Sequence, residues 1–400
     1  MTTILHISAD FPDPLAPGKT QAVASLLAAV GEYRHVVYSL NRVSWRSGIT
    51  ALEFAEDRIA LAYGAPPYGI GLSHYLQPVA ESIGEDLARR GMWPDLIHAH
   101  KFSVEGLVAA LLAEQLGCPF VTSLWGDTDI KIFEAKPMLR ARYREIAQQA
   151  ALLLPAAPWT AHYFAEALQL SQDRFEVLPV ITAADAIVEP RIVNTPRCVT
   201  ALALDSWRRK GLDCLAKAVV MCGRRIPDLV VDVYGRGSAR VLLDVQRVIH
   251  EAGAEDRLRL AGPSPHGTMQ WTMNQYAAFL LPTRRETYGM VHVEAILAGV
   301  PILWSQDRGI DGLSDGLDVG YRCDPSSVED VAAGIASIID RQAELKRNIG
   351  ELQVSGALDH FRRPAIAARY RELIGRIVGD SPSISHHSRA HNPRYESLPS

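Results

Sequence analysis

Short apolar runs alternate along the chain with longer amphipathic stretches, and this alternation predicts strands joined by helices. In the first half, residues 95–100 and 119–125 are apolar runs of strand length, and the stretch between them fits a helix that ends at Gly117. The pattern restarts at residues 199–204 and continues to an apolar run at 276–283. Because such alternation is typical of βαβ units, we predict an α/β protein with two doubly wound parallel sheets.

The length of 400 residues favours two domains, because one hydrophobic core seldom serves so long a chain. Residues 177–197 are punctuated by prolines, have weak periodicity and make the best linker candidate. We place the first domain at residues 1–190 and the second at 191–361, with a ligand cleft between them at the carboxyl ends of the strands. The polar end, residues 380–400, is rich in Ser, Pro and His and is predicted to be disordered.

Composition narrows the functional class. Hydrophobic residues make up 48% and charged residues 22%, and a net charge of −4 gives no argument for nucleic-acid binding. The start, MTTILHISAD, lacks the features of a signal peptide, and no apolar run approaches the length of a spanning helix, so we expect a cytoplasmic protein. The five cysteines are scattered without a Cys-x-x-Cys pair, which favours reduced thiols over disulfides or zinc. They are Cys118, Cys198, Cys214, Cys222 and Cys323.

Residues 284–302, RRETYGMVHVEAILAGVPI, hold two glutamates that flank seven residues. A helix is predicted from near Gly289 to Gly299, which leaves Glu286 in the preceding loop. The N–H groups of Gly289, Met290 and Val291 then form an anion site suited to phosphate. Glu294 lies one turn into the helix on the face of Met290, where it could accept hydrogen bonds from a ribose diol. The alternative is that Glu294 is simply an acidic residue favoured by the helix dipole.

The same stretch resembles the signature of retaining glycosyltransferase family 4, in which Glu, seven residues and Glu are followed by A-x-x-A-G-x-P. The segments KGLDCLAKAV, LVVDVYGRG and LRLAGPSPHGTM upstream, and GYRCDPSSVEDVAAGI and HFRRPAIAARYRELI downstream, are similar to this family in order and spacing. The first half is similar more loosely, through DFPDPLAPG, PDLIHAH and SLWGDTD. The resemblance implies a GT-B fold of two Rossmann-like domains, with the donor in the second and the acceptor mainly in the first. The helix at about 362–378 is then expected to pack back on the first domain.

On the donor side, the resemblance assigns Glu286 to the transferred sugar, Glu294 to the ribose and Lys210 to the diphosphate. A fixed cation stabilises the leaving phosphate most, because charge grows there as the glycosidic bond breaks. The arginine that the family usually has about five residues earlier is replaced by Asp205. Either Arg208 or Arg209 could substitute, and we favour Arg209.

Two further donor contacts follow from the resemblance. Gly18 resembles the small-residue loop through which the first domain approaches the donor. Main-chain groups near Pro263 and Ser264 are expected to recognise the base.

On the acceptor side, His98 and His100 alternate on one predicted strand and share a face. Because neither a cysteine nor a third histidine lies nearby in sequence, we expect no metal. A structural role and an acceptor contact both remain open for His100. Trp125 stands where many relatives have histidine; a tryptophan cannot act as a general base, although it can stack on a sugar. Asp127 is a candidate polar group for the acceptor.

Residues 131–146, KIFEAKPMLRARYREI, are read as a basic helix of the acceptor domain. Through residues 131–144 it could contact anionic headgroups and reach a lipid-linked acceptor. The alternative is a solvated helix face. The cations are Lys131, Lys136, Arg140, Arg142 and Arg144.

We therefore predict a retaining, metal-independent glycosyltransferase that moves a hexose from a UDP- or GDP-sugar to an acceptor hydroxyl, with no other cofactor. SQDRGIDG, at 305–312, is similar to members acting in bacterial surface-polysaccharide assembly, so a lipid-linked oligosaccharide in polysaccharide or glycolipid biosynthesis is the expected acceptor. The alternatives are a nucleotide-sugar epimerase of the same fold and a catalytically silent sugar-nucleotide-binding subunit. The sequence does not identify the base and the sugar of the donor, the position of the linkage that is formed, or the oligomeric state.

Overall fold

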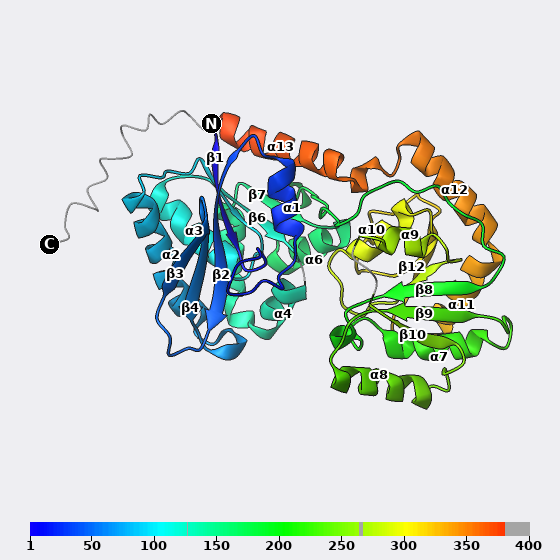
Figure 1. Ribbon diagram of the computed structural model, residues 1–400. Helices are drawn as coiled ribbons and strands as arrows, with labels where there is room; N and C mark the ends of the chain where they lie inside the picture. Colours follow the sequence, from blue (N-terminus) through cyan, green and yellow to red (C-terminus); the bar gives the residue numbers. More distant parts are fainter. Residues whose placement is uncertain (126, 264–266, 381–400) are drawn as a thin grey trace.

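The computed structural model describes residues 1–125, 127–263 and 267–380. Within these ranges the chain forms two α/β lobes that lie side by side, each built around its own sheet (Figure 1). The expectation of two parallel-sheet α/β units is therefore confirmed. The predicted disordered tail covered residues 380–400, but Asp380 ends the last helix. The rest of that tail and the base-contact candidate Ser264 lie outside the described residues.

The N-terminal lobe has a seven-stranded sheet in the order β3-β4-β2-β1-β5-β6-β7. Adjacent strands in this sheet run parallel, except that β3 and β4 pair antiparallel at one edge. Because β1 lies between β2 and β5, the chain winds in opposite directions from the centre, which opens a crevice at the carboxyl ends of β1 and β5. The strands are β1 (Thr3–Ser8), β2 (Arg34–Val43), β3 (Thr50–Ala55), β4 (Arg58–Gly64), β5 (Leu96–Ala99), β6 (Phe120–Leu124) and β7 (Leu152–Pro155).

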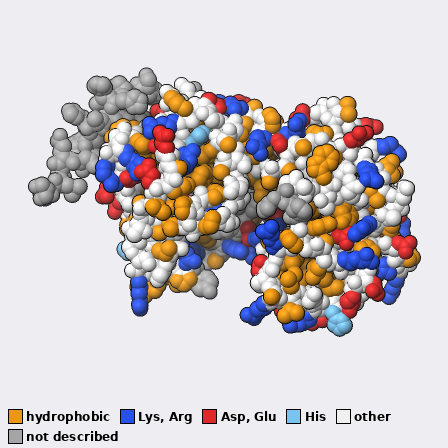
Figure 2. All heavy atoms as spheres, in the orientation of Figure 1, with side chains coloured by type: hydrophobic (Ala, Val, Ile, Leu, Met, Phe, Trp, Pro, Cys, Tyr) orange, Lys and Arg blue, Asp and Glu red, His pale blue; other side chains and the backbone are white. Residues whose placement is uncertain are grey.

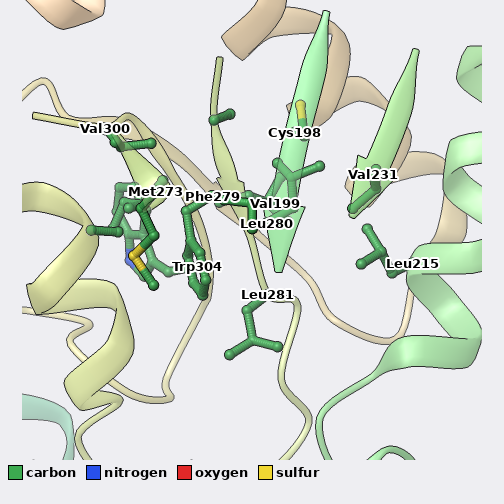
Figure 3. Close-up of a cluster of buried hydrophobic side chains, with 14 of the residues drawn as sticks. Cys198, Val199, Leu215, Val231, Met273, Phe279, Leu280, Leu281, Val300 and Trp304 are labelled. Atoms are coloured by element: carbon green, nitrogen blue, oxygen red, sulfur yellow. The ribbon is translucent and has the colours of Figure 1, made fainter. Parts of the chain in front are cut away.

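The C-terminal lobe has a six-stranded parallel sheet in the order β10-β9-β8-β11-β12-β13. Strand β11 is shorter than the predicted run 276–283, because the chain bends at residues 276–277 after α9 and because Pro282 has no N–H to continue the ladder. The core around β11 is apolar and buried, with Val199, Phe279 and Leu281 at most 1% exposed (Figure 3). The strands are β8 (Arg197–Ala201), β9 (Val230–Tyr234), β10 (Leu258–Gly262), β11 (Phe279–Leu280), β12 (Ile302–Ser305) and β13 (Gly320–Cys323).

Helices cover both sheets, and several of them begin or end at a glycine or a proline. Helix α3 stops at Gly117, whose φ of 64° is left-handed, and α6 starts with Pro158. In the N-terminal lobe the helices are α1 (Ala22–Ala29), α2 (Leu72–Arg89), α3 (Glu105–Leu116), α4 (Asp127–Ala135), α5 (Arg140–Gln149) and α6 (Pro158–Leu168). The others are α7 (Leu212–Cys222), α8 (Ala239–Glu251), α9 (Met269–Met273), α10 (Met290–Leu297), α11 (Val328–Asp340), α12 (Gln342–Ser355) and α13 (Arg363–Asp380). Short 3₁₀ turns lie at Pro67–Gly69, Pro137–Leu139, Gln172–Arg174, Leu204–Ser206 and Asp359–Phe361.

The prediction of one basic helix over residues 131–146 is wrong. The chain breaks between α4 and α5 at Pro137, which lacks an N–H for a continuous helix. Lys131 pairs with Asp127, and the Arg144 guanidinium donates to the Leu168 carbonyl at 2.7 Å. These cations therefore do not form one continuous face, which weakens the argument for membrane contact. None of the helices in the described ranges has the length and hydrophobicity needed to cross a bilayer.

The last helix, α13, returns to the N-terminal lobe and runs along its upper edge beside α1 (Figure 1). The Tyr370 hydroxyl lies 3.1 Å from His98 Nδ1, and Arg371 pairs with Glu32 after α1. The linker candidate, residues 177–197, has no regular secondary structure until β8 begins, although Leu178 and Ile181 are buried. The domain boundary at residue 190 stays a prediction.

Candidate active site

Two loops of the C-terminal lobe carry the residues predicted to be catalytic. The loop before α7 holds Lys210, and the loop before α10 holds Glu286. The Arg209 carbonyl joins these loops, since it accepts hydrogen bonds from the N–H groups of Arg284 at 2.9 Å and Arg285 at 3.2 Å. The Lys210 ammonium consequently forms an ion pair with the Glu286 carboxylate, and the side chains are 14% and 19% exposed. The predicted pair is adjacent in space although 76 positions separate its members in sequence.

The close approach of the two loops depends on Gly211. Its φ is 72°, a left-handed conformation that favours glycine. A Cβ atom there would lie 1.9 Å from the Pro282 carbonyl oxygen, so a side chain would force the loops apart. Gly211 therefore helps to hold Lys210 against Glu286.

Helix α10 begins beside Glu286. Gly289 precedes its first residue with a φ of 73°, and a Cβ there would lie 2.7 Å from His292 Nδ1 and 3.4 Å from Glu286 Cγ. Met290 and Val291 form the first turn of the helix, the position where backbone amides and the helix dipole favour a negative charge. The carboxylate predicted for the sugar and the amides predicted for the diphosphate are thus neighbours.

Glu294 lies one turn further along α10, where it contacts the interdomain linker. The backbone N–H groups of Ala184 and Ala183 lie near its carboxylate and act to lower its pKa. Burial acts in the opposite direction and more strongly, and it raises the pKa of Glu294 to about 7. The carboxylate predicted to hold a ribose is thus engaged with the linker in this structure.

Asp127, the first residue of α4, meets three cations. Its carboxylate lies 2.7 Å from Arg285, 3.1 Å from Lys131 and 3.4 Å from Arg209. Arg209 and Arg285 belong to the C-terminal lobe, so two of these pairs cross between the lobes. The Thr287 hydroxyl accepts a hydrogen bond from the Asp127 N–H at 3.0 Å.

The two candidate arginines have different surroundings. The Arg208 guanidinium stacks on the ring of Trp207, 4.4 Å from its centroid. Arg209 reaches across to Asp127 instead. This difference supports Arg209 as the second donor cation.

A cavity of about 660 Å³ lies where α4 and α6 face the C-terminal loops. Figure 2 shows the same two lobes as a surface with an indentation between them. Glu286 and Asp127 reach this cavity, so it adjoins the Lys210–Glu286 pair. Aromatic and charged side chains mix in its wall, a combination suited to a polar ligand. The lining residues are Asp127, Ile130, Lys131, Glu134, Trp159, His162, Tyr163, Glu166, Arg285, Glu286, Asp307 and Arg308.

Comparison with known protein families identifies the family of the chain. Residues 202–352 match the family model described as "Glycosyl transferases group 1", and residues 20–180 match the "Glycosyl transferase 4-like domain". Each match falls on one lobe, and the first contains both Lys210 and Glu286. The chain belongs to glycosyltransferase family 4.

The relatives of this glycosyltransferase-family chain differ in length. The GtfA subunit of UDP-N-acetylglucosamine–peptide N-acetylglucosaminyltransferase from Streptococcus gordonii is 29% identical over 221 residues, which are 52% of this chain and 41% of that protein. The N-acetyl-alpha-D-glucosaminyl L-malate synthase of Bacillus anthracis is 23% identical over 334 residues, 79% and 81% of the two chains. The chain thus spans less than half the length of the streptococcal relative.

Solved structures confirm the expected GT-B arrangement. Sucrose-phosphate synthase from Thermosynechococcus elongatus superposes with a TM-score of 0.72 at 18% identity, over 95% of this chain and 100% of that one. A lipopolysaccharide outer core galactosyltransferase gives 0.67 at 14% identity, over 94% and 99%. At such identities the likeness shows the fold alone.

The histidine pair of the family-4 chain belongs to a larger buried cluster. His6 on β1 lies beside His98 on β5, and its Nδ1 is 3.0 Å from Nε2 of His100. On its other side, His6 Nε2 is 2.9 Å from Nδ1 of His35, whose Nε2 donates to the Val30 carbonyl. With every Nε2 protonated, the three rings form one hydrogen-bonded chain. Burial lowers the pKa of His6 and His100 well below the usual value, so the chain is neutral.

His6 is the third histidine near His98 and His100. The sequence did not predict this position, because only the pairing of β1 with β5 brings His6 beside His98. One ligand atom from each ring lies within 4.8 Å of the others, a grouping that could hold a metal ion. However, His98 already contacts Tyr370 at 3.1 Å and Ser123 at 2.9 Å. These hydrogen bonds favour a structural network, and the prediction of no metal remains a prediction.

His100 is only 1% exposed, and the Trp125 ring packs against it with centroids 5.7 Å apart. This packing favours the structural role over an acceptor contact for His100. Gly18 lies in an exposed turn after β1, and Pro263 is exposed at the end of β10. Their donor contacts stay predictions.

Sequence reasoning missed a charged group at the carboxyl ends of β1 and β5. Lys101 pairs with Asp10 at 2.7 Å, and Glu105 accepts from the Ala9 N–H at 2.5 Å. Burial raises the pKa of Glu105 to about 8. Asp10 and Lys101 each come directly after a predicted strand, and this position is a signal that could have indicated the charged group.

Proposed function

We propose that the chain transfers a hexose from a nucleoside-diphosphate sugar to an acceptor hydroxyl, with retention of configuration. The observation that carries this proposal is the Lys210–Glu286 ion pair beside the start of α10 and at the edge of the 660 Å³ cavity. A cation, a helix N-terminus and a carboxylate together suit the two ends of such a donor. Family membership supports the same chemistry.

Each group has a distinct part in this reaction. Lys210 stabilises the charge that grows on the leaving phosphate, and Arg209 supports it. Diphosphate binding draws Lys210 away from Glu286, which frees the carboxylate to hydrogen-bond the transferred sugar. Glu294 binds the ribose by exchanging its linker amides for the diol.

Proton transfer needs no protein base in this scheme. The acceptor attacks the face from which the phosphate departs, and a phosphate oxygen takes the acceptor's proton. Trp125 cannot act as a base, and His100 is buried. Because Lys210, Arg209 and the α10 amides supply positive potential at the diphosphate, we propose that transfer does not require a metal.

The relatives guide the choice of substrates. Two of them are named for N-acetylglucosaminyl transfer, so UDP-N-acetylglucosamine is the first donor to test beside GDP-sugars. The Bacillus anthracis synthase is also named for L-malate, and a further relative is named for D-inositol 3-phosphate, so these small acceptors belong beside the proposed lipid-linked oligosaccharide.

The test has two stages. A thermal-shift panel with UDP, GDP and ADP identifies the base, because a ligand that binds the native state raises its stability. Nucleotide release is then followed with the matching sugar, with and without acceptor, and in the presence of EDTA. Acceptor-dependent release that survives EDTA, with NMR showing the donor's anomeric configuration in the product, is expected. Release without acceptor would indicate an epimerase, and binding without turnover would indicate a silent subunit.

A further inference from the structure

Asp127 stands between the proposed donor site and the cavity. Its carboxylate is 3.4 Å from the Arg209 guanidinium, and it also lines the cavity beside Glu286. The side chain is 19% exposed, so its charge is shielded from water on most sides. It is therefore in a position to respond to ligands on both sides.

The backbone around Asp127 is fixed to the opposite lobe. The Asp127 N–H donates to the Thr287 hydroxyl at 3.0 Å, and that hydroxyl donates to the Trp125 carbonyl at 3.2 Å. Thr287 directly follows Glu286, so the start of α4 is tied to the loop of the proposed reaction centre. Movement of the Asp127 carboxylate is thus confined to its side chain.

The cations of the donor site already have protein carboxylates as partners. Lys210 pairs with Glu286, and Arg209 pairs with Asp127. A diphosphate that binds both cations must therefore replace both carboxylates. The contact to Arg209 is the looser one for Asp127, since the distance to Arg285 is 2.7 Å and Arg209 is 46% exposed.

We propose that Asp127 is a positioning residue that competes with the donor diphosphate for Arg209 and turns to the acceptor cavity once the donor is bound. After the exchange its carboxylate keeps Arg285 and Lys131, both of which line the cavity. Donor binding therefore prepares the acceptor side, and the donor binds before the acceptor. This inference rests on the proposed function, because it takes Arg209 as a donor cation.

The test measures UDP and uridine affinity by calorimetry for the wild type, Asp127→Asn and Glu134→Gln; GDP and guanosine replace them if only GDP binds. We expect Asp127→Asn to bind UDP about three- to fivefold more tightly, the upper part of the range for removing one surface ion pair, because Asp127 is mostly shielded from water while Arg209 is half-exposed. Uridine carries no phosphate, so its affinity should not change. Glu134→Gln removes a negative charge from the same helix and cavity without touching Arg209, and should leave both affinities within about twofold.

A double-mutant cycle separates the exchange from a change in folding. In an Arg209→Gln background, Asp127→Asn should no longer tighten UDP binding, and the Michaelis constant for the acceptor should rise in Asp127→Asn itself. Unchanged or weaker UDP binding by Asp127→Asn, an equal gain for uridine, or a gain that persists without Arg209 would overturn the proposal. If the wild type binds no nucleoside diphosphate, the proposed donor fails and the exchange fails with it. If the wild type binds one but Asp127→Asn has no effect, the exchange alone fails.

Discussion

Replacing Lys210 with methionine tests the proposed centre most directly. Methionine keeps an unbranched apolar side chain of similar length but removes the charge that pairs with Glu286. Lys210 is 14% exposed, so the substitution removes a cation that is largely shielded from water. The loss should fall on the reaction more than on binding, because Arg209 and the first turn of α10 remain to hold the nucleotide.

The magnitude follows from Coulomb's law. Two unit charges about 4 Å apart interact by about 4 kcal/mol at an effective dielectric constant near 20. Only part of a unit charge develops on the leaving phosphate, so about 3 kcal/mol of transition-state stabilisation is lost. This corresponds to a decrease of about 10²-fold in kcat, since each 1.36 kcal/mol is about a factor of ten.

The assay is single-turnover release of UDP from UDP-N-acetylglucosamine, or of the nucleotide that the thermal-shift panel identifies. Arg208→Met is the matched control, because Arg208 precedes Lys210 by two residues and stacks on Trp207 instead of reaching Glu286. The control should stay within about threefold of the wild type. A Lys210→Met rate within about fivefold of the wild type, or equal losses in both variants, would refute the assignment of Lys210 to the leaving group.

Three further predictions concern α10 and its flanks. Glu286→Ala should lower turnover about 10²-fold or more while UDP affinity stays within a few-fold, whereas Glu294→Ala should weaken UDP binding. Kinetics and calorimetry on both variants check this prediction. The reverse pattern would exchange the two roles. Burial raises the pKa of Glu294 to about 7, so the folded state holds an extra proton between about pH 4.5 and 7 and loses stability as pH rises through that window. Urea unfolding of Glu294→Gln from pH 5 to 8 should show a flatter profile than the wild type, whereas parallel profiles would contradict the raised pKa. Gly289→Ala should lower the free energy of unfolding by about 1–3 kcal/mol because of its left-handed φ and the nearby His292 ring, while Gly375→Ala, in open space on α13, should cost nothing; similar unfolding midpoints for the two would disprove the strain.

Local patterns predicted the parts of the site that depend on neighbours in sequence. Gly117 and Gly289 mark helix boundaries because they adopt left-handed conformations, and the structure has α3 end and α10 begin there. The loop position of Glu286 followed from the same reasoning. Pro137 is an equally clear signal, since a proline inside a helical pattern interrupts it, and it outweighs the continuous run of basic residues around it.

Other features could not be predicted, because they depend on which elements become neighbours in three dimensions. His6 reaches the His98 face only through the parallel register of β1 and β5. The contact of Glu294 with Ala183 and Ala184 depends on the path of an irregular linker. Hydrophobic periodicity along the sequence shows which face of one helix or strand meets the core. It contains no information on which distant elements become neighbours.

The loop that carries Glu286 and the loop after β12 both hold the two lobes together. Thr287 bonds to the start of α4, and the Gly309 carbonyl accepts a hydrogen bond from Trp159 on α6 at 2.9 Å. A Cβ atom at Gly309 would lie 3.6 Å from Glu286 Cγ, so this second contact also lies beside the proposed centre. Opening the lobes would break both contacts and would remove α4 and α6 from the cavity wall. The cavity and the reaction centre therefore form together, and a ligand that needs both favours the closed arrangement.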